Sequence, residues 1–184
     1  MDPKAITDLS KFLSFVLRHK PEAVGLEIDP NGWVEIEQLV EKCHQHGKTL
    51  TKGIVEAIVT TSPKRRFAIS EDGLRVRANQ GHSIEIDLGY EPKEPPGLLF
   101  HGTVSSSIES IRSAGLKRMD RHHVHLSPDV ATARAVGIRR GKPIVLQIAA
   151  VRMHRDGHAF FLSTNGVWLT ERVPPEYIHF PPEP

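Results

Sequence analysis

The sequence predicts an α+β protein built from two lobes, and three observations lead to this expectation. Apolar residues recur at helical spacing through residues 9–59, and short strand-like runs dominate the second half. Between them the stretch YEPKEPPG, residues 90–97, holds three prolines and a glycine, which is typical of a semi-rigid linker. We therefore expect lobes at 1–91 and 98–184, joined by a proline-rich linker at 92–97.

Composition excludes several classes of protein. With 184 residues, of which 39% are hydrophobic and 25% charged, the chain is long enough for two globular lobes with modest cores. No apolar run approaches the ~20 residues of a membrane helix, and no targeting segment is visible at the N-terminus. The lone Cys43 excludes an internal disulfide and fits a reducing compartment, so we expect a soluble, cytoplasmic protein. The net charge is only +2, so eleven histidines and clustered arginines predict charged patches rather than a uniformly basic surface.

The first helix should end near Arg18 and His19, because Pro21 disfavours helical backbone at Lys20. Its apolar stripe at helical spacing consists of Leu9, Phe12, Leu13, Val16 and Leu17. Arg18 falls opposite this stripe and His19 on its flank, so neither belongs to the core.

In the rest of the first lobe, the sequence predicts a pair of extended segments, two helices and a hairpin. The extended pair comprises residues 25–29 and 33–36, around a Pro-Asn-Gly turn. The second helix closes at Gly47 and the third opens at Thr51. Alternation around Asp-Gly predicts a β-hairpin over 67–77. Three helices followed by a hairpin form a winged-helix pattern, which often binds nucleic acid, although the fold alone does not establish that function.

The second lobe predicts short strands, with two helical stretches near 105–114 and 129–138. The five strand-like runs are GLLFHGT at 97–103, HHVHLS at 122–127, PIVLQIAAV at 143–151, HAFFLS at 158–163 and GVWLT at 166–170. This lobe is therefore expected to be α+β as well.

Three cationic clusters are candidates for an anion site, centred on Arg18-His19, Arg65-Arg66 and Arg121. The first two have a plainer interpretation. The first would complement the negative end of a helix dipole, worth roughly 0.3–1 kcal/mol, and charge runs such as the second are usually solvated faces. If the clusters converge, their guanidinium groups and an imidazole would bind a phosphate dianion well, since each guanidinium can contact two oxygens.

Histidines also invite a metal interpretation, because His122, His123 and His125 lie close together and His101 lies upstream. No HExxH or CxxC motif accompanies them, and alternation places His123 and His125 on one face with His122 on the other. We expect no metal site. A glycine-rich phosphate loop of the Rossmann or P-loop type is also missing from the sequence.

Five motifs carry a resemblance to a known family: SKFLSFVLRHKPEAVGLEIDPNGWV, KRRFAI, LFHGT, HVHLS and NGVWLTERVP. In this order they span nearly the whole chain. The chain resembles the RNA 2′-phosphotransferase family, which includes the enzyme that removes the splice-junction 2′-phosphate during tRNA splicing. The resemblance implies an RNA-binding lobe of winged-helix type and an ADP-ribosyltransferase-like lobe that binds NAD⁺.

The resemblance also implies site residues. The catalytic residues it implies are Arg18, His19, Arg66 and Arg121. The NAD⁺ site it implies comprises His101, Gly102 and Thr103 of the first strand, Ile111 and Leu116 beside adenine, His125, Leu126 and Ser127 at the nicotinamide end, and Val167. Related transferases that modify proteins carry a glutamate where Val167 falls here. A phosphate acceptor is already anionic and needs no such base, so the valine agrees with phosphate chemistry.

The implied reaction has two steps and no metal. The RNA 2′-phosphate displaces nicotinamide from NAD⁺, which gives a 2′-phospho-ADP-ribosylated RNA. The 2″-hydroxyl then attacks the phosphorus and releases 2′-OH RNA and ADP-ribose 1″,2″-cyclic phosphate. Two other functions stay open: ADP-ribosylation of terminal phosphates of nucleic acid, and NAD sensing by a non-catalytic nucleic-acid-binding protein. The sequence indicates no obligate protein partner.

Overall fold

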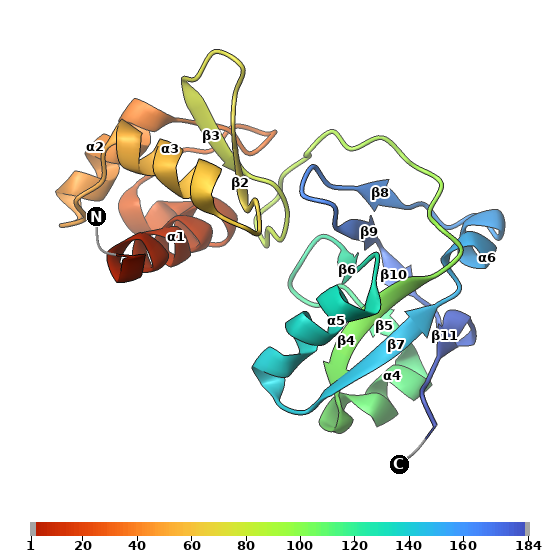
Figure 1. Cartoon of the computed structure of the whole chain (residues 1–184). Helices are drawn as coiled ribbons and strands as arrows, with labels where there is room; N and C mark the ends of the chain where they lie inside the picture. The colour runs from red at the N-terminus through yellow and green to blue at the C-terminus, as the bar shows by residue number, and fades with distance from the viewer. Residues whose placement is uncertain (1–2, 183–184) are drawn as a thin grey trace. The chain divides into compact units, whose positions relative to one another are not determined.

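A computed structural model describes residues 3–182, apart from the side chains of Pro3 and Arg140. It divides into two compact units, Met1–Gly89 and Tyr90–Pro184, which are called unit 1 and unit 2 below (Figure 1). Both units mix helices with small antiparallel sheets, so the α+β expectation is confirmed. Among the described residues, every helix is too short or too polar to cross a bilayer.

The described residues of unit 1 form three α-helices and a three-stranded sheet. Its elements are α1 (Pro3–Arg18), the 3₁₀ turn η1 (Pro21–Val24), β1 (Val34–Glu35), α2 (Ile36–Gln45), α3 (Lys52–Thr61), β2 (Phe67–Ile69) and β3 (Arg75–Ala78). As predicted, α1 ends at Arg18 and the hydroxyl of Thr51 caps α3 by accepting a hydrogen bond from the Ile54 amide. The predicted hairpin is also present, since β2 and β3 pair antiparallel.

The predicted extended pair is wrong. Residues 25–29 form no strand, and β1 instead pairs with β3, which gives the sheet order β1-β3-β2. The Asp29 carboxylate accepts hydrogen bonds from the amides of Asn31 and Trp33. These local bonds fix a side-chain-stabilised turn where the sequence suggested a hairpin.

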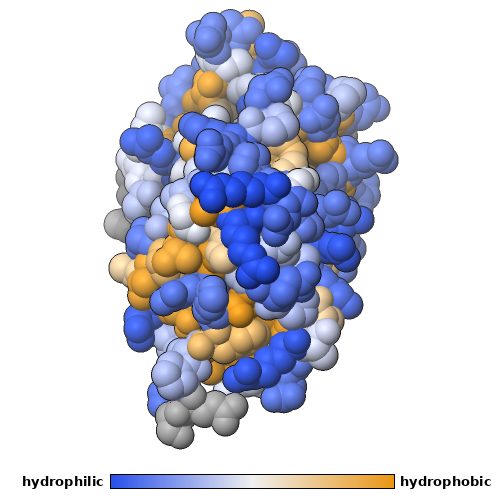
Figure 2. Space-filling model, turned by 90° about the vertical axis from the view of Figure 1, so that its right-hand side faces the viewer, coloured by the Kyte–Doolittle hydropathy of each residue, from blue (hydrophilic) through white to orange (hydrophobic). Residues whose placement is uncertain are grey.

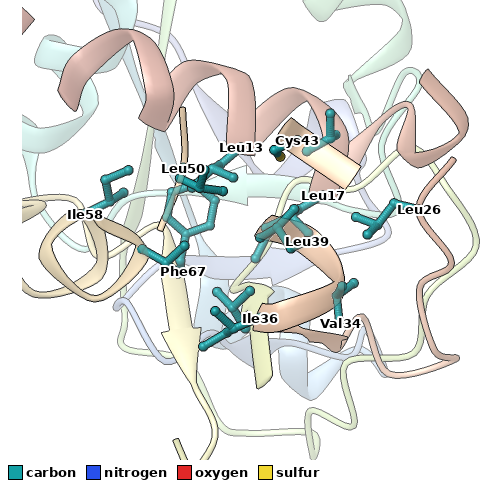
Figure 3. Packing of buried hydrophobic residues seen from close by; sticks show 14 of the residues in the cluster. Leu13, Leu17, Leu26, Val34, Ile36, Leu39, Cys43, Leu50, Ile58 and Phe67 are labelled. Carbon is teal, nitrogen blue, oxygen red and sulfur yellow. The ribbon is translucent and has the colours of Figure 1, made fainter. Parts of the chain in front are cut away.

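The core of unit 1 lies between the helices and the sheet (Figure 3). Leu17 of α1 lies beside Leu39 of α2, and Leu13 of α1 and Phe67 of β2 belong to the same core. Cys43 is also fully buried there, and burial raises the pKa of its thiol to about 11. This cysteine is therefore a core residue.

Unit 2 is built on two three-stranded sheets and one two-stranded sheet. The strands are β4 (Leu99–Val104), β5 (Leu116–Lys117), β6 (Val124–Leu126), β7 (Pro143–Ile148), β8 (Phe161–Leu162), β9 (Trp168–Thr170), β10 (Arg172–Val173) and β11 (Ile178–His179). The sheet orders are β11-β7-β4, β6-β9-β8 and β10-β5. The helices are η2 (Ser105–Ser107), α4 (Ile108–Ala114), α5 (Val130–Gly137), η3 (Ile138–Arg140), α6 (Ala150–Arg155) and η4 (Pro175–Tyr177).

Each of the five strand-like runs contains a strand, but one of them ends early. Residues 149–151 were expected to continue the run from residue 143, whereas β7 stops at Ile148 and α6 begins at Ala150. The two partner strands, β4 and β11, begin at Leu99 and Ile178, which both lie opposite Ile148. Ala150 and Met153, at helical spacing, are both fully buried. In the sequence, the buried apolar residues at the start of α6 therefore look like a continuation of the strand.

The exposed surface mixes apolar and hydrophilic residues in the view of Figure 2. Among the described residues, the large apolar side chains on the surface of unit 2 include Val130, Val136 and Ile138 on or beside α5. Scattered apolar residues of this kind are normal for a protein surface.

Candidate functional site

Unit 1 carries an open groove of about 520 Å³ between α1, the end of α3 and the residues that lead into β2. Figure 1 shows these three elements side by side in unit 1. Three of the four side chains expected to be catalytic, Arg18, His19 and Arg66, line this groove. Its other lining residues are Ile6, Thr7, Ser10, Lys11, Ser14, Phe15, Ile58, Thr61, Ser62 and Pro63.

Arg18 is the last residue of α1 and is half-buried. Its Nη2 donates a hydrogen bond of 3.3 Å to the carbonyl oxygen of Arg66, 48 residues further along the chain. Its guanidinium carbon lies 5.9 Å from the centre of the Phe67 ring, within the range of a cation–π contact. These contacts hold Arg18 toward β2. A side chain that served only the helix dipole would need neither of them.

His19 follows the helix end, and its ring is held by the segment that follows β3. The Nδ1 of His19 lies 2.9 Å from the hydroxyl oxygen of Ser83. The Ser83 amide in turn donates a 2.9 Å hydrogen bond to the carbonyl oxygen of Arg18. Ser83 therefore fixes both the imidazole and the backbone of the helix end.

Arg66 lies directly before β2, and its side chain reaches the groove while Phe67 enters the core. The preceding Arg65 has a positive φ of 39°, an uncommon conformation for a non-glycine residue. Asn79 stabilises this turn: its amide donates to the Arg66 carbonyl oxygen at 2.9 Å, and its side-chain Nδ2 donates to the Arg65 carbonyl oxygen at 2.7 Å. Asn79 is 3% exposed, so it acts from inside the unit.

The arrangement suits a phosphate. Two guanidinium groups and an imidazole line one groove, and no aspartate or glutamate lines it in the part of the chain that the structure describes. Guanidinium groups bind phosphate oxygens through paired hydrogen bonds, which an ammonium group cannot match in geometry.

The fourth expected catalytic residue, Arg121, belongs to unit 2. It is exposed, and its Nη1 lies 3.5 Å from Nδ1 of His125. His125 is in β6, and its carbonyl oxygen lies 3.1 Å from Nδ1 of His101 in β4. The structure thus brings Arg121, His101 and His125 together within unit 2. That Arg121 meets Arg18 and Arg66 at one phosphate stays a prediction.

The two strands that carry these histidines are joined beside them. Phe100 and Ser127 form an isolated antiparallel bridge, with amide-to-carbonyl hydrogen bonds of 2.9 and 2.7 Å in the two directions. Ser127 therefore lies one residue beyond β6 and opposite the residue that precedes His101. Imidazole and hydroxyl groups at this junction are suitable donors and acceptors for ribose hydroxyls.

Gly102 has a packing role that the motif alone did not reveal. A Cβ atom at this position would lie 1.9 Å from the carbonyl oxygen of Ala133 and 2.9 Å from the amide nitrogen of Gly137, both in α5. The absence of a side chain at Gly102 is therefore what lets α5 pack directly on β4. Thr103, next along the strand, is 7% exposed.

The other residues expected to contact NAD⁺ lie at different depths. Ile111, Leu116 and Leu126 belong to the core of unit 2, with 8%, 5% and 1% exposure. Val167 lies before β9 in a turn whose geometry Ser163 fixes, since the Ser163 hydroxyl accepts a 3.0 Å hydrogen bond from the Val167 amide. Contacts of these residues with a dinucleotide stay predictions.

His123, another histidine of the cluster, packs against an aromatic ring. His123 contacts the edge of the Phe161 ring, with centroids 5.5 Å apart. Burial, followed by electrostatic interaction with the nearby His122 and Arg118, lowers the pKa of His123, although Glu171 acts in the opposite direction. Among the described residues, no group of three or more His, Cys, Asp or Glu side chains could hold a metal ion.

Two positioning residues, Asn79 and Ser83, were missed in the sequence. Both belong to the polar stretch Asn-Gln-Gly-His-Ser that follows β3, in which Gly81 has a positive φ of 87°. The available signal was an asparagine directly after a predicted hairpin strand. The sequence does not show that Asn79 is buried or which backbone groups it bonds. Their partners, Arg18 and Arg66, come from two other segments of the chain.

Comparisons with known proteins agree on one family. Residues 4–172 match the family model described as RNA 2′-phosphotransferase, Tpt1 / KptA family. A protein of Rhodopirellula baltica is 51% identical over 179 residues, which cover 97% of each chain, and one of Streptomyces coelicolor is 51% identical over 181 residues, 98% of each. A Nostoc punctiforme protein is 48% identical over 178 residues, 97% of this chain and 98% of its own. Each of the three is named a probable RNA 2′-phosphotransferase.

Proposed function

The chain belongs to the RNA 2′-phosphotransferase family, and from this premise we propose that it transfers an internal RNA 2′-phosphate to NAD⁺-derived ADP-ribose. The products would be 2′-OH RNA, nicotinamide and ADP-ribose 1″,2″-cyclic phosphate. The observation that carries this proposal is the groove of unit 1, in which Arg18, His19 and Arg66 come together from two distant segments.

In this proposal Arg18 and Arg66 bind the 2′-phosphate and orient it. The Arg18 guanidinium is already directed toward β2 by its bond to the Arg66 carbonyl and its contact with Phe67. Such preorganised cations stabilise charge that develops on phosphoryl oxygens without having to reorganise during the reaction. Arg121 of unit 2 would supply a third guanidinium to the same phosphate.

His19 would transfer a proton or fix the phosphate. Imidazole is the side chain best suited to proton transfer near neutral pH, and the Ser83 hydroxyl orients it here. Its proton transfer would accompany the second step, in which the 2″-hydroxyl of ADP-ribose attacks the phosphorus.

NAD⁺ would be held by unit 2, and the residues present fit such a group. His101, His125 and Ser127 gather donors and acceptors where β4 meets β6, and Arg121 adds a cation beside them. Bound NAD⁺ supplies an anomeric carbon with a cationic leaving group, so the chain itself needs only to bind, orient and exclude water. The winged-helix character of unit 1 and the ADP-ribosyltransferase-like character of unit 2 are parts of the same proposal.

One experiment tests the proposed reaction. The protein is mixed with NAD⁺ and an RNA that bears a single internal 2′-phosphate, in the presence of EDTA, and the products are identified by mass. We expect 2′-OH RNA together with the cyclic phosphate and free nicotinamide. RNA that retains ADP-ribose as its final product would instead indicate transfer to phosphates without the second step. Binding without nicotinamide release would indicate a non-catalytic role and overturn the proposal.

A further inference from the structure

The groove of unit 1 extends along α1 well beyond Arg18. Its wall includes Thr7, Ser10, Lys11, Ser14 and Phe15, which lie on the side of α1 that does not enter the core. At a rise of 1.5 Å per residue, Lys11 and Arg18 are roughly 10 Å apart along the helix axis. This stretch is far longer than a single phosphate needs.

Phe15 is the aromatic side chain of this wall. It lies one turn after Lys11, so these two side chains share one face of α1, and His19 follows directly after the end of the helix. It is 43% exposed, although the neighbouring Val16 and Leu17 are completely buried. An exposed aromatic ring beside a cluster of phosphate-binding cations is the combination with which proteins bind single-stranded nucleic acid.

Lys11 adds an exposed cation at the far end of the same face. Its ammonium group lies 3.1 Å from the Asp8 carboxylate, but the two side chains are 74% and 59% exposed. Exposed pairs of this kind contribute little and are readily exchanged. Lys11 can therefore turn to a nucleic-acid phosphate without a large loss.

We propose that this face of α1 binds the single-stranded RNA that flanks the 2′-phosphate, with Phe15 stacking on the base of a neighbouring nucleotide and Lys11 contacting a backbone phosphate. The inference rests on the function proposed above and adds the surface that holds RNA next to the reacting group. Ser10 and Ser14 line the same groove wall, where the Ser14 hydroxyl donates a 2.9 Å hydrogen bond to the Ser10 carbonyl oxygen.

The plainer alternative is that Phe15 is one of the apolar residues that every surface exposes. Leu74, in the β2–β3 turn of the same unit, is 52% exposed and does not line the groove. It provides a matched control, since an alanine there removes similar apolar surface.

The test uses an RNA that carries one 2′-phosphate and 2-aminopurine, a base whose fluorescence is quenched by stacking. Two probes place the 2-aminopurine on the 5′ or the 3′ side of the phosphorylated nucleotide, and binding is measured without NAD⁺. We expect quenching with the wild type for one probe, loss of that quenching in Phe15→Ala, and a dissociation constant raised roughly tenfold. Phe15→Trp should retain both, and Leu74→Ala should match the wild type.

A separate control ligand, a 2′-phosphorylated mononucleotide, has no neighbouring base. It should bind the wild type and Phe15→Ala equally, because Arg18 and Arg66 remain. For the longer RNA, Lys11→Ala should reduce the slope of the logarithm of the binding constant against the logarithm of salt concentration by roughly 0.7. Lys52→Ala, which removes an exposed lysine at the start of α3, should leave the slope unchanged.

The outcomes separate this inference from the proposed function. If the wild type releases nicotinamide with 2′-phosphorylated RNA but Phe15→Ala equals it with both probes, only the stacking surface is overturned. If the wild type neither binds the mononucleotide nor releases nicotinamide, the proposed function fails. Loss of binding by Leu74→Ala to the same extent as Phe15→Ala would also overturn the role of Phe15.

Discussion

At the scale of single residues, the groove depends on side chains that are held by backbone groups from elsewhere. Arg18 bonds the carbonyl of Arg66, and Asn79 and Ser83 bond the backbone on both sides of that contact. The Arg18 guanidinium and the backbone of Arg66 are therefore held in place by the protein itself. We expect such preorganisation of a binding site and not of solvated charges.

Replacement of Arg18 tests this distinction. We expect Arg18→Ala to lower turnover of 2′-phosphorylated RNA about a hundredfold or more, because a preorganised donor to the phosphoryl oxygens is lost. The control is Lys20→Ala, which removes an exposed cation from the same helix end. A dipole role would make the two variants alike in turnover. Steady-state kinetics, with melting temperatures recorded for both variants, decide between the two interpretations.

Cys43 should be unreactive in the folded protein. Burial raises its pKa from 9.0 to about 11, which lowers the thiolate fraction about a hundredfold, and the thiolate is the reactive form. Iodoacetamide at pH 8 should therefore label it very slowly until denaturant is added. The control is Cys43→Ala with Ser106→Cys, which carries its thiol at an exposed position and should be labelled at similar rates with and without denaturant. Rapid labelling of the folded wild type would contradict this prediction.

At the scale of elements, Gly102 lets the backbones of α5 and β4 come very close together. The carbonyl oxygen of Ala133 occupies the space that a side chain at residue 102 would need. Because β4 also carries His101 and Thr103, this packing sets the position of the strand that we expect to face NAD⁺.

Gly102→Ala should therefore be strongly destabilising. The new methyl group cannot be accommodated by a side-chain rotation, since the atoms it meets are backbone, and we expect a loss of about 3 kcal/mol or more. Gly53→Ala in α3 is the matched control: it meets nothing within 4 Å and should leave stability unchanged or raise it by up to about 1 kcal/mol. Denaturant titrations compare the two. Equal stability of both variants would contradict the packing role of Gly102.

Local signals explain which elements could be predicted. Pro21 marked the end of α1 and Thr51 the start of α3, and both signals act within one helical turn. The strands β5, β10 and β11 were not predicted, because each has two residues and exists only through its partner strand. Long-range pairing of this kind leaves no periodic pattern in the sequence.

The same reasoning separates the parts of the site. Arg18 and Arg66 were recognisable as cations in family motifs, but only the fold shows that they line one groove. Asn79 and Ser83 act through hydrogen bonds to backbone atoms of other segments, which no sequence pattern specifies. Gly102 looked like a ligand-binding glycine and has a packing role as well.

At the scale of the whole molecule, each unit has its own core. Among the described residues, the two core clusters draw on separate parts of the chain, one before residue 79 and one after residue 98. Each unit also holds one of the two tryptophans, Trp33 in unit 1 and Trp168 in unit 2. The two fluorophores can therefore report on the two units separately.

The stability of unit 2 should fall when the pH drops below about 6.5. Burial, and then electrostatic interaction with His122 and Arg118, lower the pKa of His123 in the folded protein, so the unfolded chain binds this proton more readily. Between the lowered pKa and the ordinary value of 6.5, unfolding takes up a proton and is favoured by acid. Above pH 6.5 both states are neutral at this residue and the contribution to stability is complete.

Single-tryptophan variants measure this effect. In the Trp33→Phe variant, Trp168 reports the denaturant concentration at the unfolding midpoint. This concentration should be lower at pH 5.5 than at pH 7.5. His123→Phe added to this variant should reduce the fall, because phenylalanine can keep a ring packed against Phe161 without binding a proton. With Trp168→Phe, the midpoint reported by Trp33 should not respond to His123→Phe, since His123 lies outside the core of unit 1. A fall in the Trp168 midpoint that is undiminished in the His123→Phe variant would assign the pH dependence to other groups of unit 2.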